Sequence, residues 1–311
     1  MKIEEMIKAN RADCSGCEAC ANICPKNAIK MIRDAEGFAY PNIDVELCIK
    51  CGRCDATCPS LNFKKRTLNN LPAAFVAIYD NDKILRHSSS GAVFSALSEI
   101  ILNSGGIVFG AGFDENFHVY HTSAKNLDEL ENLRGSKYVQ SQIGNIYRQV
   151  RAALKSQNVL FSGTPCHCAG LKHFLGKDYD NLLTVEIICH GTPPPALWEN
   201  YIDSVGYAHE ITNVNFRSKR NAWGGRGASF LDINFSDQAH KISSTNNNLY
   251  GRLFLRNLSL RPSCSACKAR FPNVHSDLSL GDAWGIPDFL PEFFDTRGVS
   301  AVVVHTDKGQ N

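Results

Sequence analysis

The sequence predicts a protein of the α+β and α/β classes, in which a small cysteine-rich module precedes a larger α/β core with a mixed sheet. Two observations carry this prediction. Eight of the 13 cysteines lie between Cys14 and Cys58 in two runs of the same spacing, and the next cysteine is Cys166. From Ala73 onward, apolar β-branched runs alternate with amphipathic stretches, as strands and helices do in α/β domains. A chain of 311 residues is long enough for about two or three cores.

The N-terminal cysteines have the bacterial spacing for a pair of [4Fe–4S] clusters. Each run reads C-x-x-C-x-x-C-x-x-x-C-P. Three closely spaced thiolates wrap one face of a cubane, and the fourth, followed by proline, reaches across to the other cluster. The expected ligand sets are Cys14, Cys17, Cys20 with Cys58, and Cys48, Cys51, Cys54 with Cys24. A structural zinc site or a disulfide framework is the alternative, but neither has this duplicated rhythm.

The polar segment from Asn62 to Asn70 separates this ferredoxin-type module, residues 1–66, from the core. In the core, the predicted strands are Ala73–Tyr79, Ile107–Phe113, Val159–Ser162, Leu182–Cys189, Val214–Arg217, Phe230–Phe235 and Val299–Val304. Apolar residues at intervals of three and four predict helices at Val93–Leu102, Ile143–Leu154, Ala169–Leu175 and Leu249–Leu255. No G-x-G-x-x-G follows the first strand, so we expect a mixed sheet rather than a regular dinucleotide-binding repeat, and Gly105-Gly106 as a helix C-cap.

Composition indicates a reducing compartment. The net charge is +2, no signal peptide is present, and no apolar run approaches the roughly 20 residues of a membrane helix. We therefore expect a cytoplasmic protein without membrane insertion, whose clustered thiols are metal ligands. No basic stripe predicts nucleic-acid binding. The sequence also lacks a Ser-His-Asp order, a Walker loop and paired catalytic carboxylates, which argues against hydrolysis.

The five remaining cysteines are Cys166, Cys168, Cys189, Cys264 and Cys267. Cys166 follows one predicted strand and Cys189 ends the next. If these strands are parallel, both thiols lie at the same edge of the sheet, where ligands gather in α/β folds. Cys264-x-x-Cys267 then closes a third four-thiolate site, and the alternative is a pair of buried free cysteines with a structural CxxC.

Seven segments of the core carry a family resemblance. They are Ser89–Gly91, Leu133–Ser141, Phe161–Cys166, Ile188–Gly191, Asn215–Arg217, Leu260–Cys264 and Gly281–Gly285. In this order they resemble the coenzyme F420 hydrogenase/dehydrogenase beta-subunit family over nearly the whole chain after residue 73. The resemblance implies a family N-terminal domain at residues 67–157 and a C-terminal flavin and iron–sulfur domain at residues 158–311. It also implies an FAD-binding core with one [4Fe–4S] cluster on Cys166, Cys189, Cys264 and Cys267, behind a ferredoxin-like dicluster module.

Flavin anchoring has a chemical basis as well, because a pyrophosphate favours helix N-termini, small residues and cations. The loop Ser88–Gly91 offers hydroxyls and amides before a helix, although an ordinary serine N-cap is the alternative. The candidate cofactor-binding residues are Ser89, Ser90, Gly91, Arg134, Lys137, Gly163, Thr164, Arg217, Lys219, Asp282 and Trp284. His190 is a candidate proton donor because imidazole titrates near neutrality, with a structural hydrogen bond as the favoured alternative.

Two positions depart from the resembled family. Ala92 stands where many relatives carry a second glycine, and His167 stands where they often carry glutamine, beside the extra Cys168. We expect Cys168 to be a small buried side chain. The chain ends at Asn311, soon after the last predicted strand, where relatives are expected to continue, so we expect a short or truncated member.

The resemblance implies an oxidoreductase that passes electrons from a ferredoxin-like donor through [4Fe–4S] clusters to FAD and on to a small-molecule acceptor, either coenzyme F420 or another substrate. The alternative is a non-catalytic electron relay in a larger redox complex. Both predict a redox partner protein.

Overall fold

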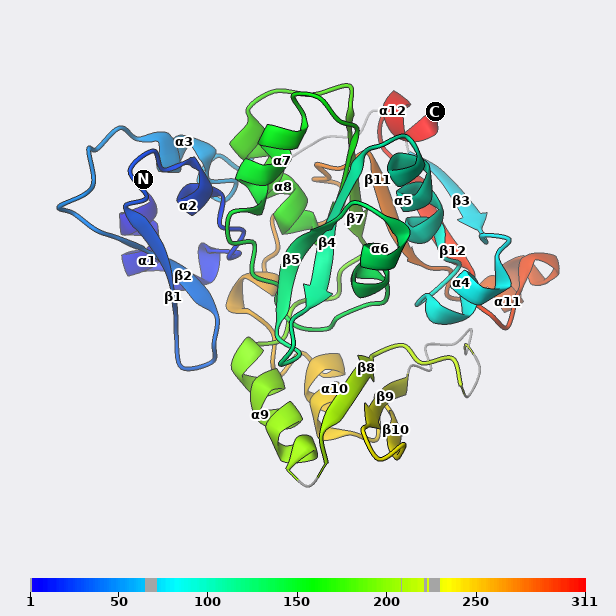
Figure 1. Ribbon diagram of the computed structural model, residues 1–311. Coiled ribbons are helices and arrows are strands. Elements are labelled where there is room, and N and C mark those ends of the chain that lie inside the picture. Colours follow the sequence, from blue (N-terminus) through cyan, green and yellow to red (C-terminus); the bar gives the residue numbers. More distant parts are fainter. Residues whose placement is uncertain (1, 65–71, 208, 221–222, 224–229) are drawn as a thin grey trace.

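The computed structural model describes residues 2–64, 72–207, 209–220, 223 and 230–311 (Figure 1). The module boundary predicted at residues 66 and 67 lies outside these ranges. At the centre is a seven-stranded sheet in the order β3-β12-β11-β7-β6-β4-β5. Its strands are β3 (Ala73–Ala77), β4 (Ile107–Phe113), β5 (Val119–Ala124), β6 (Val159–Gly163), β7 (Leu182–Ile187), β11 (Leu278–Asp282) and β12 (Ser300–Val304). Neighbours among β4, β6, β7 and β11 pair in parallel, and β3, β5 and β12 pair antiparallel, so the predicted mixed sheet is confirmed.

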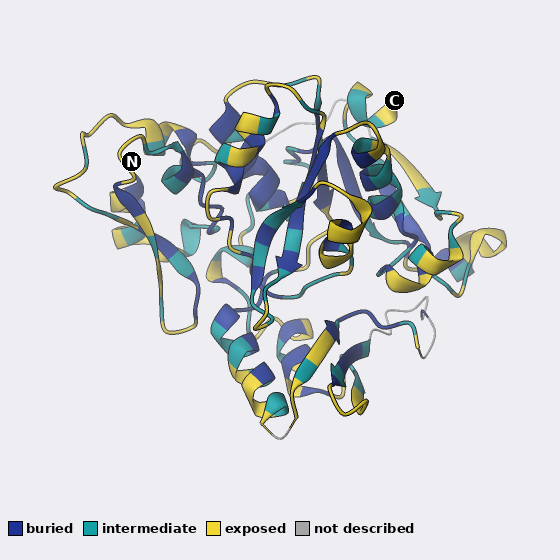
Figure 2. Cartoon of the chain, in the orientation of Figure 1, coloured by how far each residue is buried: buried dark blue, intermediate teal, exposed yellow. Residues whose placement is uncertain are grey.

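Both faces of this sheet are covered by helices, and alternate residues of each strand point to opposite faces. Phe109 and Phe161 pack beneath α7 (Ile146–Ala153) and α8 (Pro165–Leu175). Val108 and Leu160 pack beneath α5 (Val93–Asn103) and α6 (Leu127–Leu133) on the other side. The central strands are accordingly the most buried part of the chain (Figure 2).

The N-terminal module repeats one local geometry twice. Helix α2 (Ala19–Ile23) follows Glu18 at φ 59°, and α3 (Arg53–Thr57) follows Gly52 at φ 71°. Both helices end on the fourth cysteine of a run, in nearly the same extended conformation, and proline follows each. The module is completed by α1 (Ile3–Ala9), η1 (Arg11–Asp13) and a hairpin of β1 (Ile29–Arg33) with β2 (Ala39–Ile43).

The module is fixed to the core by burial and by hydrogen bonds. Cys17 and Ala19 belong to the hydrophobic core formed under α7 and α8. Arg148 of α7 donates to the backbone carbonyls of Ala21, Asn22 and Cys24 at 3.2, 2.6 and 2.9 Å. Module and core therefore share one packed interface, seen in Figure 1 where α2 lies beside α7 and α8.

A third layer lies below the sheet in Figure 1. Helices α9 (Pro195–Gly206) and α10 (Leu249–Leu255) pack with a small antiparallel sheet of β8 (Ile211–Asn215), β9 (Phe230–Phe235) and β10 (His240–Ser244). The short elements α4 (Asp82–His87), η2 (Pro262–Cys264), α11 (Ile286–Phe289), η3 (Pro291–Phe293) and α12 (Asp307–Gln310) complete the described fold.

Several predicted boundaries are wrong in detail. Strand β7 ends at Ile187, which leaves Cys189 in the following loop, and β8 ends at Asn215, which leaves Arg217 in a turn. Helix α8 begins at Pro165 instead of Ala169, because a proline is well suited to the first helical turn. The predicted glycine cap is confirmed: Gly106 N donates to Ile101 O and Gly105 N to Leu102 O, as in a Schellman motif.

The predicted boundary between residues 157 and 158 lies between α7 and β6. Strands from both sides of it form the single central sheet.

Candidate functional site

The first predicted ligand set faces one space. Cys14, Cys17, Cys20 and Cys58 all line a small cavity of about 20 Å³ together with Ile3 and Met6. Burial raises the pKa values of the Cys17 and Cys20 thiols, and the neighbouring thiols raise them further. Thiolate charge is therefore unfavourable here without a cation, and a bound metal core supplies that positive charge.

The second set lies on the outer side of the module. Cys51 is exposed, and Cys24, Cys48 and Cys54 are half-buried. Burial, followed by the Asp55 carboxylate, raises the pKa of Cys54. The second set is thus the more accessible of the two in the module.

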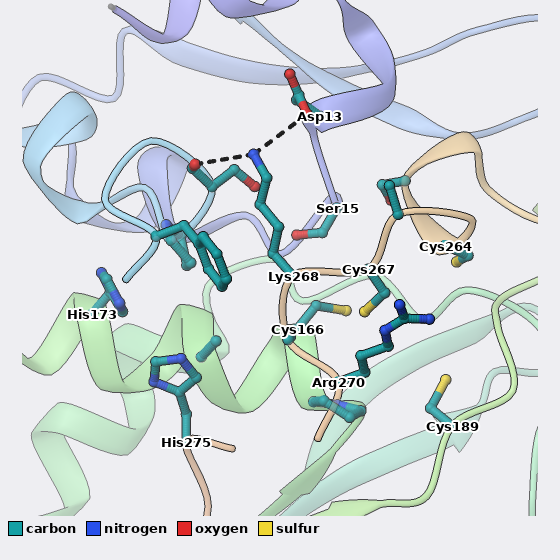
Figure 3. A pocket seen from close by; sticks show the side chains of 18 of the residues that line it. Asp13, Ser15, Cys166, His173, Cys189, Cys264, Cys267, Lys268, Arg270 and His275 are labelled. Carbon is teal, nitrogen blue, oxygen red and sulfur yellow. Dashed lines mark hydrogen bonds and ion pairs between the residues drawn. The ribbon is translucent and has the colours of Figure 1, made fainter. Parts of the chain in front are cut away.

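The third set comes from three separate segments. Cys166 lies in the first turn of α8, Cys189 in the loop after β7, Cys264 at the end of η2, and Cys267 just beyond it. All four line a cavity of about 560 Å³, which we call the cysteine cavity. In Figure 3 their sulfur atoms face the same part of this cavity. Burial raises the pKa of Cys166 to about 11, although a hydrogen bond of 3.1 Å between its Sγ and Thr164 Oγ1 acts in the opposite direction and lowers this pKa.

The thiols of the described residues do not converge on a single point. In the part of the chain that the structure describes, no three His, Cys, Asp or Glu side chains are grouped closely enough to hold one metal ion. A cubane binds its four thiolates at four different iron atoms and needs a wider arrangement. In residue type and number, four free thiols in each set, the donor sets fit [4Fe–4S] clusters.

Helix α8 connects the first and third sets. A Cβ added at Gly170 would lie 2.9 Å from Cys17 Cβ and 3.1 Å from its Sγ, so only a glycine allows this approach. Four residues earlier on the same helix, Cys166 lines the cysteine cavity. The two thiol sets are therefore separated by little more than one turn of α8.

A second cavity, of about 300 Å³, lies at the carboxyl ends of β6 and β7 and beside α5. We call it the cationic cavity because Arg134, Lys137 and Arg217 line it. Residues 164–167 separate it from the cysteine cavity. Thr164 and His167 line the cationic cavity, and the two residues between these positions, Pro165 and Cys166, line the cysteine cavity. A group in either cavity is thus separated from the other by one layer of protein.

Arg217 is held in this cavity by an ion pair, a hydrogen bond and an aromatic ring. Its Nη1 donates to Asp282 Oδ2 at 2.7 Å and to Tyr138 Oη at 3.0 Å, and its guanidinium carbon lies 5.2 Å from the Trp284 ring centroid. Nη2 is buried and has no hydrogen-bond partner among the described residues. A buried donor without an acceptor at a cavity wall suits an anionic or hydrogen-bond-accepting ligand.

The other polar residues of the cavity differ in charge. Burial lowers the pKa of Lys137 to about 7, and its Nζ donates to Arg134 O at 2.8 Å. Burial lowers the pKa of His121 to about 4, so it is neutral near pH 7, with Ser141 Oγ at 2.7 Å from Nδ1 and Ser162 O at 3.1 Å from Nε2. Both ring nitrogens of His167 are buried and without a hydrogen-bond partner among the described residues.

Most residues predicted for cofactor binding meet in this cavity. Its lining includes Ser89, Ser90, Arg134, Lys137, Gly163, Thr164, Arg217, Asp282 and Trp284. Gly91 and Lys219 do not line it. Gly91 packs against Ala77 O and Ser300 N, where a Cβ would clash, and Lys219 Nζ donates to Leu85 O and Ser90 O from behind the loop.

The serine loop does not cap α5, which corrects the N-cap alternative. The N-cap residue is Ala92, which has φ 63° and makes no side-chain cap. Ser90 Oγ instead donates to Val299 O at 2.7 Å. Ala92 thus adopts the left-handed conformation that glycine adopts most readily.

The environments of His190 and Cys168 can be compared with their predicted roles. His190 is exposed, lines the cysteine cavity and packs edge-on against Phe254 with ring centroids 5.0 Å apart. Cys168 is fully buried in the core and its thiol lies 3.9 Å from Val185 O, so the expectation of a small buried side chain is confirmed.

Sequence reasoning missed the buried polar residues around both cavities. Tyr138, Gln140 and Arg261 lie in motifs that carried the resemblance, but nothing in their local sequence indicated a partner. Glu18 lies between two cluster cysteines and accepts the amides of Ile143 and Gly144 at 2.9 and 3.0 Å. The one signal in the sequence is that a charged residue, Glu18, stands inside a cysteine run.

Within the described ranges, no helix is long and apolar enough to cross a bilayer.

The N-terminal module and the C-terminal half of the chain each match a known protein family. Residues 13–62 match the 4Fe-4S dicluster domain, and residues 156–311 match the family described as the C terminus of the coenzyme F420 hydrogenase/dehydrogenase beta subunit. The F subunit of F(420)H(2) dehydrogenase from Methanosarcina mazei is 27% identical over 183 residues, which cover 55% of this chain and 51% of that protein. The chain thus spans about half the length of this curated relative.

Two other similarities are shorter or more distant. The ketoisovalerate oxidoreductase subunit VorC of Methanothermobacter marburgensis is 36% identical over 55 residues, 17% of this chain and 70% of that one. A chain of the F420-reducing [NiFe] hydrogenase complex from Methanosarcina barkeri superimposes with a TM-score of 0.52 at 17% identity, over 78% of each chain. That similarity shows a shared fold. Since the beta-subunit match covers half of the chain, this protein belongs to the coenzyme F420 hydrogenase/dehydrogenase beta-subunit family and carries a 4Fe-4S dicluster domain at its N-terminus.

Proposed function

We propose that this chain is an iron–sulfur flavoprotein oxidoreductase that exchanges electrons between a redox partner protein and a small-molecule acceptor. One observation carries the proposal: the first thiol set, the third thiol set and the cationic cavity follow one another around α8. Gly170 packs on Cys17, Cys166 lines the cysteine cavity, and His167 lines the cationic cavity. A chain of redox groups needs such short separations, whereas a set of structural metal sites does not.

The twelve thiols would hold three [4Fe–4S] clusters. The ligands would be Cys14, Cys17, Cys20 and Cys58 for cluster 1, Cys48, Cys51, Cys54 and Cys24 for cluster 2, and Cys166, Cys189, Cys264 and Cys267 for cluster 3. The shared cavities of the first and third sets support this assignment. The matching geometry of α2 and α3 supports the exchange of the fourth ligands between clusters 1 and 2.

Cluster 2 would be the exchange point with the partner protein. Cys51 is exposed, and the loop before it carries the exposed apolar side chains Val45, Leu47 and Ile49. Exposed apolar residues around a redox centre favour a protein partner over water. The partner would be a ferredoxin-like donor or another subunit of a complex, as the names of the M. mazei and M. barkeri relatives suggest.

The cationic cavity would bind FAD. The unpartnered Arg217 Nη2, the hydroxyls of Ser89 and Ser90, and the Trp284 ring provide a donor, small polar groups and an aromatic surface. A volume of about 300 Å³ is at the lower end for small-molecule sites, so part of the cofactor would extend beyond it. When bound, FAD supplies the exchange between one-electron and two-electron chemistry.

The protein's own residues would position the ligand and set the local charge. The Asp282 carboxylate and Tyr138 hydroxyl fix Arg217 against Trp284, and Lys219 holds the serine loop in place from behind. Lys137, with a pKa of about 7, can hold or release a proton at Nζ near neutral pH. The acceptor would be coenzyme F420 or a molecule of similar chemistry, as the names of the family and of the relatives suggest.

FAD binding by a designed pair of variants tests this proposal. Arg217→Gln with Ser90→Ala should weaken FAD binding at least tenfold, because a guanidinium and a hydroxyl partner are lost. Arg151→Gln is the matched control, since it removes an exposed arginine of α7 that does not line the cavity, and it should bind FAD as the wild type does. Iron content should stay the same in both proteins. If the reconstituted wild type binds no FAD and reduces no acceptor, coenzyme F420 included, the relay alternative replaces the enzyme.

A further inference from the structure

Arg261 is a buried cation at the junction of the module and the core. Its side chain is among the largest fully buried ones, with 1% of the residue exposed. It precedes η2, three residues before Cys264, and its guanidinium reaches across to the N-terminal module. Gly16, between Cys14 and Cys17, leaves the room for it: a Cβ there would lie 2.7 Å from Arg261 Nη1.

All the hydrogen-bond acceptors of this guanidinium are neutral. Nε donates to Cys14 O at 2.8 Å, Nη2 to Ala39 O at 3.0 Å, and Nη1 to Gln140 Oε1 at 2.8 Å. The rings of Tyr40 and Phe38 lie 4.3 and 5.2 Å from its central carbon. Among the described residues, no carboxylate forms an ion pair with it. The buried Glu18 carboxylate is near enough for Arg261 to lower its pKa against burial, but its hydrogen bonds come from the amides of Ile143 and Gly144.

Such a charge needs a compensating anion. Transferring a cation from water into a protein interior is costly even after relaxation, and buried charges are therefore normally paired. Aromatic faces offset only a small part of that cost. The backbone carbonyls satisfy the hydrogen bonds of the guanidinium without supplying a negative charge.

The two nearest thiol sets can supply it. Arg261 donates to the backbone carbonyl of Cys14, a member of the first set, and its own backbone carbonyl accepts from the amide of Cys264, a member of the third set, at 2.8 Å. Four thiolates leave each cluster anionic, and reduction adds one further negative charge. A cation fixed between two such clusters favours their reduced forms.

We propose that Arg261 is a positioning residue that raises the reduction potentials of clusters 1 and 3 by placing a buried positive charge without an ion-pair partner beside both. The proposal rests on the cluster assignment above. Gln140 completes the arrangement, because its Nε2 donates to Ser15 O at 3.1 Å while its Oε1 accepts from Arg261. One side chain thus holds both the cation and the ligand loop.

Redox titration of anaerobically purified protein, followed by EPR spectroscopy, tests this role. Arg261→Met should lower two of the three midpoint potentials by at least about 59 mV each. This shift corresponds to a tenfold smaller equilibrium constant for one-electron reduction. Gln140→Glu keeps the arginine but places a carboxylate beside it, and should lower the same two potentials. Arg261→Lys keeps the charge and should stay near the wild type. Arg151→Met, an exposed charge loss on α7, should change none of them.

Each outcome decides the question. Unchanged potentials in Arg261→Met and Gln140→Glu, with full iron content, overturn the proposal. If Arg261→Met loses iron, Arg261→Lys decides: retention of iron and potentials shows that the charge is required, and loss of both shows that only the shape of the guanidinium matters. Eight iron atoms in the wild type, measured separately, would contradict the third cluster and leave the prediction for cluster 1 intact.

Discussion

Arg148 offers a direct test of how the N-terminal module is held on the core. Its guanidinium makes four hydrogen bonds to the module: to Ala21 O, Asn22 O and Cys24 O at the C-terminal end of α2, and to Asn27 Oδ1 at 2.8 Å. The carbonyls at this helix end have no partners within the helix, and they carry the negative end of the helix dipole. Arg148→Met keeps the aliphatic part of the side chain and removes all four bonds.

The expected loss follows from these contacts. Hydrogen bonds to charged groups contribute about 1.5–3 kcal/mol each, but this side chain is half-buried and the four bonds share one cation. After discounting for solvent, we expect about 2–4 kcal/mol in total. Hydrogen exchange measured by mass spectrometry should then be about 30- to 700-fold faster in peptides covering residues 19–28, since about 1.4 kcal/mol corresponds to a factor of ten.

Arg151→Met is the matched control. Arg151 lies one turn further along α7, and its guanidinium packs over the Phe174 ring at 4.5 Å. Exchange in the same peptides should remain unchanged in this variant. Equal exchange rates in both variants would refute the inference that Arg148 holds the module.

Three other predictions concern the cavities and their thiols. Because burial places the pKa of Lys137 near 7, its charge is present below that pH and lost above it, so affinity for FAD should fall as pH rises from about 6 to 8. A Lys137→Met variant, titrated by fluorescence, should show weak binding without this slope, and a slope equal to that of the wild type would exclude Lys137. Gly170→Ala should lower the melting temperature of the anaerobic protein, because the added methyl overpacks the contact with the first thiol set. Overpacking costs about 1–3 kcal/mol of stability, and this exceeds the roughly 1 kcal/mol that alanine gains over glycine in helix propensity. Gly206→Ala, whose methyl would lie 3.3 Å from a flexible isoleucine side chain, is its control, and equal melting temperatures would contradict the tight contact. Cys168→Ala should retain as much iron as the wild type, whereas Cys166→Ser should lose about four iron atoms, and iron loss in the first variant would make Cys168 a ligand.

The sequence predicted the features that are determined locally. The spacing of the cysteine runs is set by the geometry of a cubane, and the structure groups Cys14, Cys17, Cys20 and Cys58 around one cavity as expected. The prediction that Cys166 and Cys189 lie at one sheet edge needed only a parallel pairing of neighbouring strands, which β6 and β7 have.

Contacts between distant segments could not be predicted in this way. Arg261 and Cys14 are separated by 247 positions, and no local pattern marks one as the partner of the other. Strand β11, Leu278–Asp282, contains a buried serine and a glycine, so its short apolar pattern is weak. The serine loop resembled an N-cap, but the conformation of Ala92 and the carbonyl of Val299 determine its actual contacts.

The central claim is that cluster 3 connects the N-terminal module with the cationic cavity. Stopped-flow absorbance of FAD-loaded protein mixed anaerobically with a reduced ferredoxin tests it most directly, with Cys189→Ser beside the wild type. We predict that the variant, with about eight iron atoms and normal FAD content, accepts electrons from ferredoxin into its N-terminal clusters but reduces the flavin at least tenfold more slowly than the wild type. A small chemical reductant should reduce the flavin equally in both. Equal rates of flavin reduction by ferredoxin would contradict the claim.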